Sequence, residues 1–300
     1  MRKTVPQTNA ARLFPSAASI WRHLDRMYER SVRTYRQDLT ACRRRMSRPA
    51  VHRLRVSIRR LLACLDLMGA VQNGHPAVRG TLQRQLKVLG DLRDTQNQLR
   101  RIKAEPRFAA ALQPLRRHLR MRRQRRLGAV RRALATDRVT RRLRRWRLGT
   151  VRKNSRPVAR LHRLIDRKLR QAFDPLAAFS PSRPPDSAAR HHTRMISRQY
   201  RYLVEALQPG WYDEKTGGPL CSLQAYQDVI GKSHDCELLL RRLDRLIADE
   251  RLRVASARRF RAVLRAEKNR HLKACSRLDR QVFHEALLAR QHLNQKLPPC

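Results

Sequence analysis

The sequence predicts an all-α protein, and two patterns indicate this fold class. Apolar residues recur at steps of three and four, for example at Leu54, Ile58 and Leu61, and this spacing is typical of one face of a helix. No segment alternates apolar and polar residues in the way that a half-buried strand does. The 10 glycines are few for a chain of 300 residues, and most stand where a helix is expected to end or bend.

The segment 107–173 has the most extreme composition in the chain. It holds 24 Lys and Arg against two acidic residues. Blocks of like charge often stay unfolded, so a disordered basic tract is the alternative interpretation. Leucines recur through the whole segment at spacings suited to packing, and we therefore expect helices here, at least when an anion is bound.

A tail and a linker define the predicted domain organisation. Residues 1–15 contain no continuous apolar run, so we expect a flexible tail and not a secretory signal. The proline-rich segment 179–186 predicts a linker, because its prolines exclude a helix interior. This linker separates a first half, 16–178, from a second half, 187–297, within one domain at 16–297. No stretch approaches the roughly 20 apolar residues that span a bilayer.

The cysteines and the charge indicate where the protein acts and what it binds. The 6 cysteines show no C-x-x-C spacing, which predicts reduced thiols in a cytoplasmic protein. The 70 Lys and Arg face 23 Asp and Glu, giving a net charge of +47. A surplus this large attracts polyanions. Candidate partners are DNA, RNA, anionic lipid and inorganic polyphosphate.

An internal repeat carries the most informative motifs. The pattern H-x-x-R-x-x-x-R begins at His52 and again at His191, 139 residues later. A second pattern, G-x-x-[R/H]-D, begins at Gly90 and again at Gly231, 141 residues later. Two patterns in the same order at nearly the same separation indicate an internal duplication. We expect the second pattern to form a turn in each half.

The first pattern predicts a stripe of cations on one helix face in each half, because positions i, i+3 and i+7 lie above one another on a helix. Aligned cations repel, so an anionic ligand between them would stabilise the arrangement, while a solvated basic face is the alternative. The first stripe contains Arg48, His52, Arg55 and Arg59, and the second contains His191, Arg194, Arg198 and Arg201.

These motifs resemble those of the CHAD domain, the conserved histidine α-helical domain, over nearly the whole chain. The resemblance implies two four-helix bundles related by a pseudo-twofold axis, whose basic helices line a central channel or groove. It also implies that the protein binds inorganic polyphosphate and is associated with polyphosphate granules. No cofactor is expected, and the oligomeric state is left open.

The resemblance and the repeat together predict the polyphosphate-binding residues. The complete set is Arg48, His52, Arg55, Arg59, Arg60, Lys87, Arg93, His191, Arg194, Arg198, Arg201, Tyr202 and His234. The halves are not equivalent, because Leu62 stands where the second half has Arg201, and Lys87 matches Asp228. Asp94 and Asp235 are expected to orient a helix turn or an arginine. The arginines between Arg116 and Arg126 are expected to be peripheral.

The same residues support the alternative functions less well. An enzyme with a metal site would use His234 and Asp235, but Arg93 stands where His234 does, and arginine cannot ligate a metal. We therefore expect a binding protein with no catalytic or metal-binding residues. Nucleic-acid binding is the principal alternative, although aromatic residues that could stack on bases make up only 5% of the chain. An interaction of Leu115–Leu134 with anionic lipid ranks last.

Overall fold

The computed structural model describes residues 16–72, 77–136, 138–150, 158–177, 187–207 and 218–295. Within these ranges the chain contains helices and no strand, which confirms the predicted all-α class. The helices are α2 (Ala17–Arg44), α3 (Arg48–Gln72), α4 (Arg79–Lys103), α5 (Gln113–Leu134), α6 (Arg138–Thr150), α7 (Val158–Ala177), α8 (Ser187–Leu207), α9 (Gly218–Ala248) and α10 (Val254–Gln295), with a 3₁₀ turn, η1, at Pro106–Phe108.

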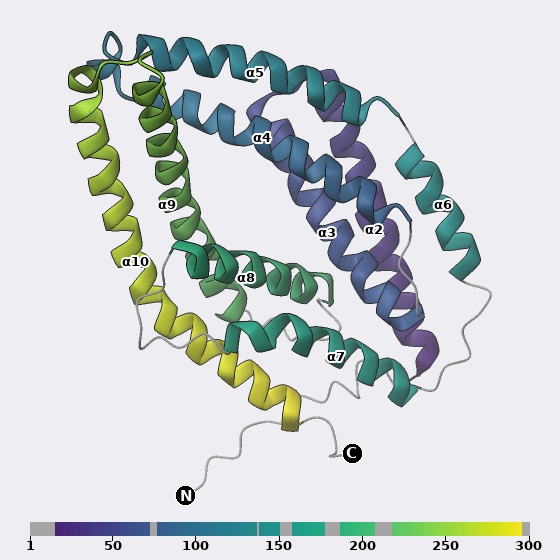
Figure 1. Cartoon of the computed structure of the whole chain (residues 1–300). Helices are drawn as coiled ribbons and strands as arrows, with labels where there is room; N and C mark the ends of the chain where they lie inside the picture. Colours follow the sequence, from purple (N-terminus) through teal and green to yellow (C-terminus); the bar gives the residue numbers. More distant parts are fainter. Residues whose placement is uncertain are drawn as a thin grey trace, which may run out of the picture.

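The helices pack in the same order in both halves of the chain (Figure 1). In the first half α2 contacts α3, α3 contacts α4, and α4 contacts α5. In the second half α7 contacts α8, α8 contacts α9, and α9 contacts α10. Helices α3 and α8, which carry the two H-x-x-R-x-x-x-R patterns, also contact each other. The description as two four-helix bundles stays a prediction.

The hydrophobic core crosses from one half of the chain to the other. One cluster joins Leu67 of α3 to Ile165 of α7 and Leu203 of α8. Another joins Leu119 of α5 to Phe260 of α10. The first cluster holds α3 against α8, so buried apolar contacts position the basic faces of both helices.

The arginine-rich segment 107–173 forms helices in its described part. Leu115, Leu119 and Leu127 of α5 are buried, as are Leu143 of α6 and Leu169 of α7. Burial of these leucines offsets the mutual repulsion of the arginines on the outer faces. The prediction that this segment is helical is therefore confirmed for α5, α6 and α7.

Some sequence predictions fall on other parts of the chain. The predicted tail 1–15 and linker 179–186 lie outside the described residues. Among the described helices, none has an apolar stretch of the length that crossing a bilayer requires. Cys42, Cys64, Cys236 and Cys275 are buried free thiols, in agreement with the expected reduced state.

Candidate functional site

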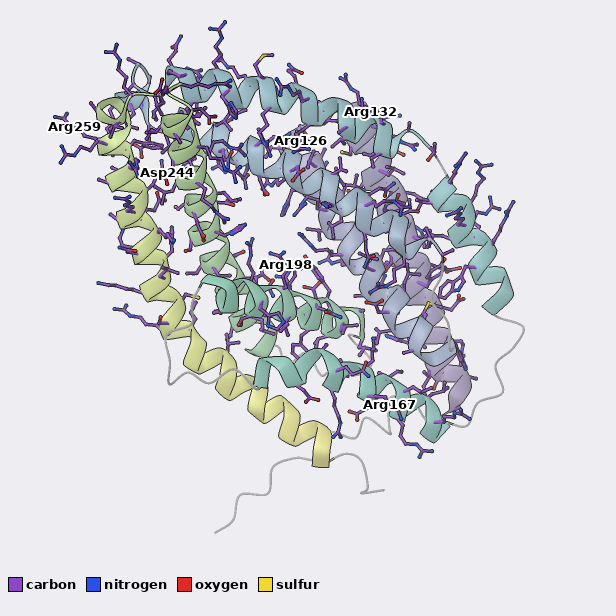
Figure 2. All side chains as sticks on the ribbon, in the orientation of Figure 1. Arg126, Arg132, Arg167, Arg198, Asp244 and Arg259 are labelled. Carbon is purple, nitrogen blue, oxygen red and sulfur yellow. The ribbon has the colours of Figure 1, made fainter. Side chains whose placement is uncertain are left out.

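Four arginines from the two halves lie together at the contact between α3 and α8. Burial, followed by the positive charges of Arg59 and Arg194, lowers the pKa of Arg198 to about 9. Burial, and then Arg59, also lowers the pKa of Arg55 to about 10, with smaller effects that include the charge of Arg194. The stripes therefore face each other closely enough for their charges to interact. Figure 2 shows Arg198 on the side of α8 that faces α3 and α4.

The two G-x-x-[R/H]-D segments support these arginines. A Cβ atom on Gly90 would lie 2.6 Å from Nη1 of Arg55, which is too close for any larger residue unless the arginine moved. The same Nη1 donates a hydrogen bond to the backbone carbonyl of Leu86 at 3.0 Å. At the equivalent place on α9, a Cβ on Gly231 would lie 3.6 Å from Nη2 of Arg194. Each glycine therefore lies next to the guanidinium of the first arginine in the H-x-x-R-x-x-x-R pattern of its own half.

The expectation that these segments form turns is wrong. Gly90 lies within α4 and Gly231 within α9, both far from the helix ends. A glycine in a helix interior lowers the stability of the helix by only about 1 kcal/mol relative to alanine. The helix-forming residues around it therefore maintain the helix. At Gly90 the glycine leaves room for the guanidinium of Arg55 to approach the backbone, and it does not mark a change in chain direction.

Asp94 and Asp235 lie among the same arginines and provide partial counter-charge. Burial raises the pKa of Asp94, and the charges of Arg55 and Arg194 oppose that rise. Burial and the charge of Asp94 raise the pKa of Asp235, while Arg194 and a hydrogen bond from Asn97 lower it. Nδ2 of Asn97 donates that bond at 3.1 Å. The role of these carboxylates in orienting a helix turn or an arginine stays a prediction.

Arg48, His52 and Arg93 extend the stripe of α3 toward α4. Nε of Arg48 donates a hydrogen bond to Oδ1 of Asn97 at 3.2 Å. Nη1 of Arg93 lies 3.5 Å from the backbone oxygen of Arg48. Burial, followed by the charges of Arg93 and Arg59, lowers the pKa of His52, so His52 is mainly neutral at pH 7.

The other predicted residues lie in different surroundings. Arg60 and Arg201 both pair with Glu205, with Nε–carboxylate distances of 3.1 Å and 3.2 Å. Tyr202 is buried, and the guanidinium of Arg201 lies 4.8 Å from its ring centroid. Lys87 is exposed on α4.

Two of the predicted histidines belong to the second half. His234 lies half-buried on α9, in the position that matches Arg93 of the first half. His191 belongs to α8, and its side chain lies outside the described part of the structure.

A second group of cations lies between α5 and α9. It corrects the expectation of peripheral arginines for Arg122 and Arg126, whereas Arg117, Arg120 and Arg125 of the same run are exposed. Nη1 of Arg126 lies 3.1 Å from a carboxylate oxygen of Asp91, the residue after Gly90. Burial, followed by the charge of Arg126, lowers the pKa of Arg122. Burial, followed by Arg122, also lowers the pKa of Arg242 on α9.

The sequence contains a weak signal for this second group. His118, Arg122 and Arg126 are spaced four apart, which places them on one side of α5. Arginine also occupies the other sides of this helix, so the spacing alone does not distinguish the side that faces α9. By contrast, Arg167 and Arg259 are exposed and lie on the periphery of the molecule (Figure 2).

The comparisons with known proteins agree with this fold. The family model of the CHAD domain matches residues 26–244. The chain belongs to the CHAD domain family. No curated protein matches it in sequence.

Two solved structures have the same CHAD fold. The CHAD domain from the plant Ricinus communis has a TM-score of 0.65 and 24% identity, covering 93% of this chain and 96% of that one. PptA from Streptomyces chartreusis has a TM-score of 0.63 and 20% identity, covering 89% of this chain and 98% of that one.

Among the described residues, one group of side chains has the composition of a metal site, and it does not include His234 or Asp235. Ligand atoms of Cys236, Glu267 and His271 all lie within 4.8 Å of one another. Glu267, however, forms an ion pair of 2.7 Å with Arg101 of α4. Burial raises the pKa of Cys236 to about 11, so the thiol keeps its proton at neutral pH. This group is better explained as an ion pair between helices than as a metal centre.

Proposed function

We propose that this CHAD protein binds inorganic polyphosphate along the facing stripes of α3 and α8. The observation that carries the proposal is the meeting of Arg55, Arg59, Arg194 and Arg198. Burial, together with the positive charge of Arg59, lowers the pKa of the other three arginines. Membership of a family associated with polyphosphate supports it. We further propose that the protein acts in the cytoplasm, at polyphosphate granules.

The proposed mechanism is multivalent capture of a linear polyanion. Each guanidinium donates hydrogen bonds to phosphate oxygens, often two at once. Phosphate charge between the stripes would also replace the repulsion between Arg59 and Arg198 with attraction. Many modest contacts along one polymer add up to a high avidity.

Nucleic acid is the alternative ligand, and the surface supports it less well. Binding of single strands generally uses aromatic side chains on which bases stack. Among the described residues, the exposed large apolar side chains are Met121, Met195 and Val254, and none is aromatic. Tyr202, the aromatic residue beside the second stripe, is buried. A site made of cations alone suits a polymer that has no bases.

The same residues favour binding over catalysis and over lipid association. The carboxylate of Asp235 accepts a hydrogen bond from Asn97 and lies near Arg194, so cations and donors surround it. We therefore propose that the protein is not an enzyme. Leu115, Leu119 and Leu127 are buried inside the protein, which leaves α5 without the apolar face that lipid binding requires.

We expect long-chain polyphosphate to bind more tightly than single-stranded DNA at physiological salt, because the site offers cations without a stacking surface. Filter binding at equal phosphate concentration, with free phosphate assayed in the same samples, provides the measurement. Equal or weaker binding of polyphosphate would favour the nucleic-acid alternative. Metal-dependent phosphate release that is lost in His234→Ala would contradict the proposal that the protein only binds.

We expect polyphosphate to bind more tightly as the pH falls from about 7.5 to 5.5, because the pKa of His52 lies below the ordinary value of 6.5. His52 is then neutral at the upper pH, and the bound polyanion stabilises its protonated form at the lower pH. One additional charged contact corresponds to roughly a tenfold gain in affinity.

The variant His52→Gln should show a smaller gain over the same pH range, and titration by fluorescence anisotropy measures it. His271→Gln is the matched control, because His271 lies on α10 beside Glu267 and not in a stripe. An unchanged pH dependence in His52→Gln would rule out His52 as the titrating group.

A further inference from the structure

A cavity of about 500 Å³ lies between α2, α3 and α8, and the polyphosphate proposal does not use it. The charged and titratable side chains that line it are His23, Arg26, Arg30, Arg60 and Glu205. Small-molecule sites commonly have volumes of about 300–1,000 Å³, so the cavity has the size of a ligand site. Its lining contains three arginines and one carboxylate, a clear surplus of positive charge.

The cavity is distinct from the basic stripe of α3. Arg60 follows Arg59 in the sequence, and the next residue on a helix points about 100° away around the axis. Arg26 and Arg30 belong to α2, which contributes no residue to either stripe. Arg60, one of the predicted polyphosphate ligands, also lines this cavity.

Glu205, the acidic residue of the lining, is paired with two arginines. Its Oε2 accepts a hydrogen bond from Nε of Arg60 at 3.1 Å, and its Oε1 lies 3.2 Å from Nε of Arg201. Both oxygens of the carboxylate therefore face guanidinium groups. The arginines of α2 lie in the same cavity without adding a second carboxylate to its lining.

The hydroxyl groups of the lining indicate the kind of ligand that the cavity suits. The hydroxyl of Thr34 donates to the backbone oxygen of Arg30 at 2.9 Å, and that of Ser57 donates to the backbone oxygen of Leu54 at 3.1 Å. A hydroxyl has one proton to donate, so these two groups offer a ligand only acceptors. The guanidinium groups are the charged donors of the lining, and they select an anion over a neutral polar molecule.

We propose that this cavity is a second anion site, which binds a compact phosphate anion of two or three phosphoryl groups independently of polymer bound to the stripes. Such an anion is multiply charged, which matches the surplus of arginines in the lining. It is also compact enough for a cavity of about 500 Å³, in which each water-sized group takes about 30 Å³. The fold would then distinguish short phosphate chains from long ones by using two separate basic surfaces.

Isothermal titration calorimetry of the full chain with inorganic tripolyphosphate tests the proposal. The wild-type protein should bind at both the stripes and the cavity. Arg26→Gln with Arg30→Gln should remove the cavity site and lower the stoichiometry by one, since each guanidinium contributes roughly tenfold to affinity. Arg141→Gln with Arg144→Gln, the same change in charge on exposed residues of α6, should leave the stoichiometry unchanged.

Glu205→Gln provides a test in the opposite direction. Removal of a negative charge from the lining should strengthen binding of tripolyphosphate at the cavity by roughly tenfold. An unchanged stoichiometry in the α2 variant, an equal loss in the α6 control, or weaker binding in Glu205→Gln would overturn the proposal. Long-chain polyphosphate should bind the α2 variant as it binds the wild type, so the two proposals can fail separately.

Discussion

Replacing Arg55, Arg59, Arg194 and Arg198 with alanine should weaken polyphosphate binding and flatten its salt dependence by roughly 3 units of log affinity against log salt concentration. Each phosphate neutralised contributes a slope of about 0.7 for a flexible strand. Because the four guanidinium groups interact at one place, one polymer should contact all of them. Replacing the pair on α3 or the pair on α8 alone should flatten the slope by about half as much. Filter binding over a series of salt concentrations measures these slopes.

The matched control replaces four arginines on the outside of the molecule. Arg141, Arg142, Arg144 and Arg145 are exposed residues of α6, which packs against α2 and away from the contact between α3 and α8. The run from Arg116 to Arg126 is unsuitable, because Arg122 and Arg126 belong to the group between α5 and α9. If the α6 control loses as much affinity and slope as the stripe variant, binding is diffuse and the stripes are ordinary solvated faces.

Arg198→Met should stabilise the protein without ligand while it weakens binding. The pKa of Arg198 is lowered to about 9 by burial and by neighbouring arginines, so the folded state disfavours its charged form. Arginine keeps its charge at neutral pH, so the whole cost of burying that charge is present there. Methionine keeps an apolar stem without the charge, and the free energy of unfolding should rise by about 1–2 kcal/mol.

Thermal unfolding with and without polyphosphate measures both effects. Saturating ligand at about 100 times the Kd should stabilise the wild type by about 2.7 kcal/mol, or several degrees in Tm. Arg198→Met should begin from a higher Tm and gain less from the ligand. Arg141→Met is the control for a general loss of charge. A wild-type Tm that saturating polyphosphate leaves unchanged, or a lower Tm for ligand-free Arg198→Met, would contradict the repulsion inferred between the stripes.

Local sequence patterns were sufficient to predict the helices and to predict which residues form each basic stripe. Apolar residues at steps of three and four predict helices because the helical repeat is a property of the backbone. The same repeat places Arg55 and Arg59 on one face of α3, and Arg194 and Arg198 on one face of α8, whatever else the chain does. The duplicated motifs predicted the CHAD family for the same reason, since they depend only on residue types and spacing.

The tertiary structure decided which helix faces meet, because that depends on packing between segments far apart in the chain. It brought Gly90 beneath Arg55 inside a helix where a turn was expected, and it buried Tyr202. It placed Arg122 and Arg126 beside charged groups of α4 and α9 instead of at the periphery. It also paired Arg60 with Glu205, which is 145 residues away in the sequence. A spacing rule relates residues on one helix, whereas the burial of apolar faces between helices determines which cations become neighbours.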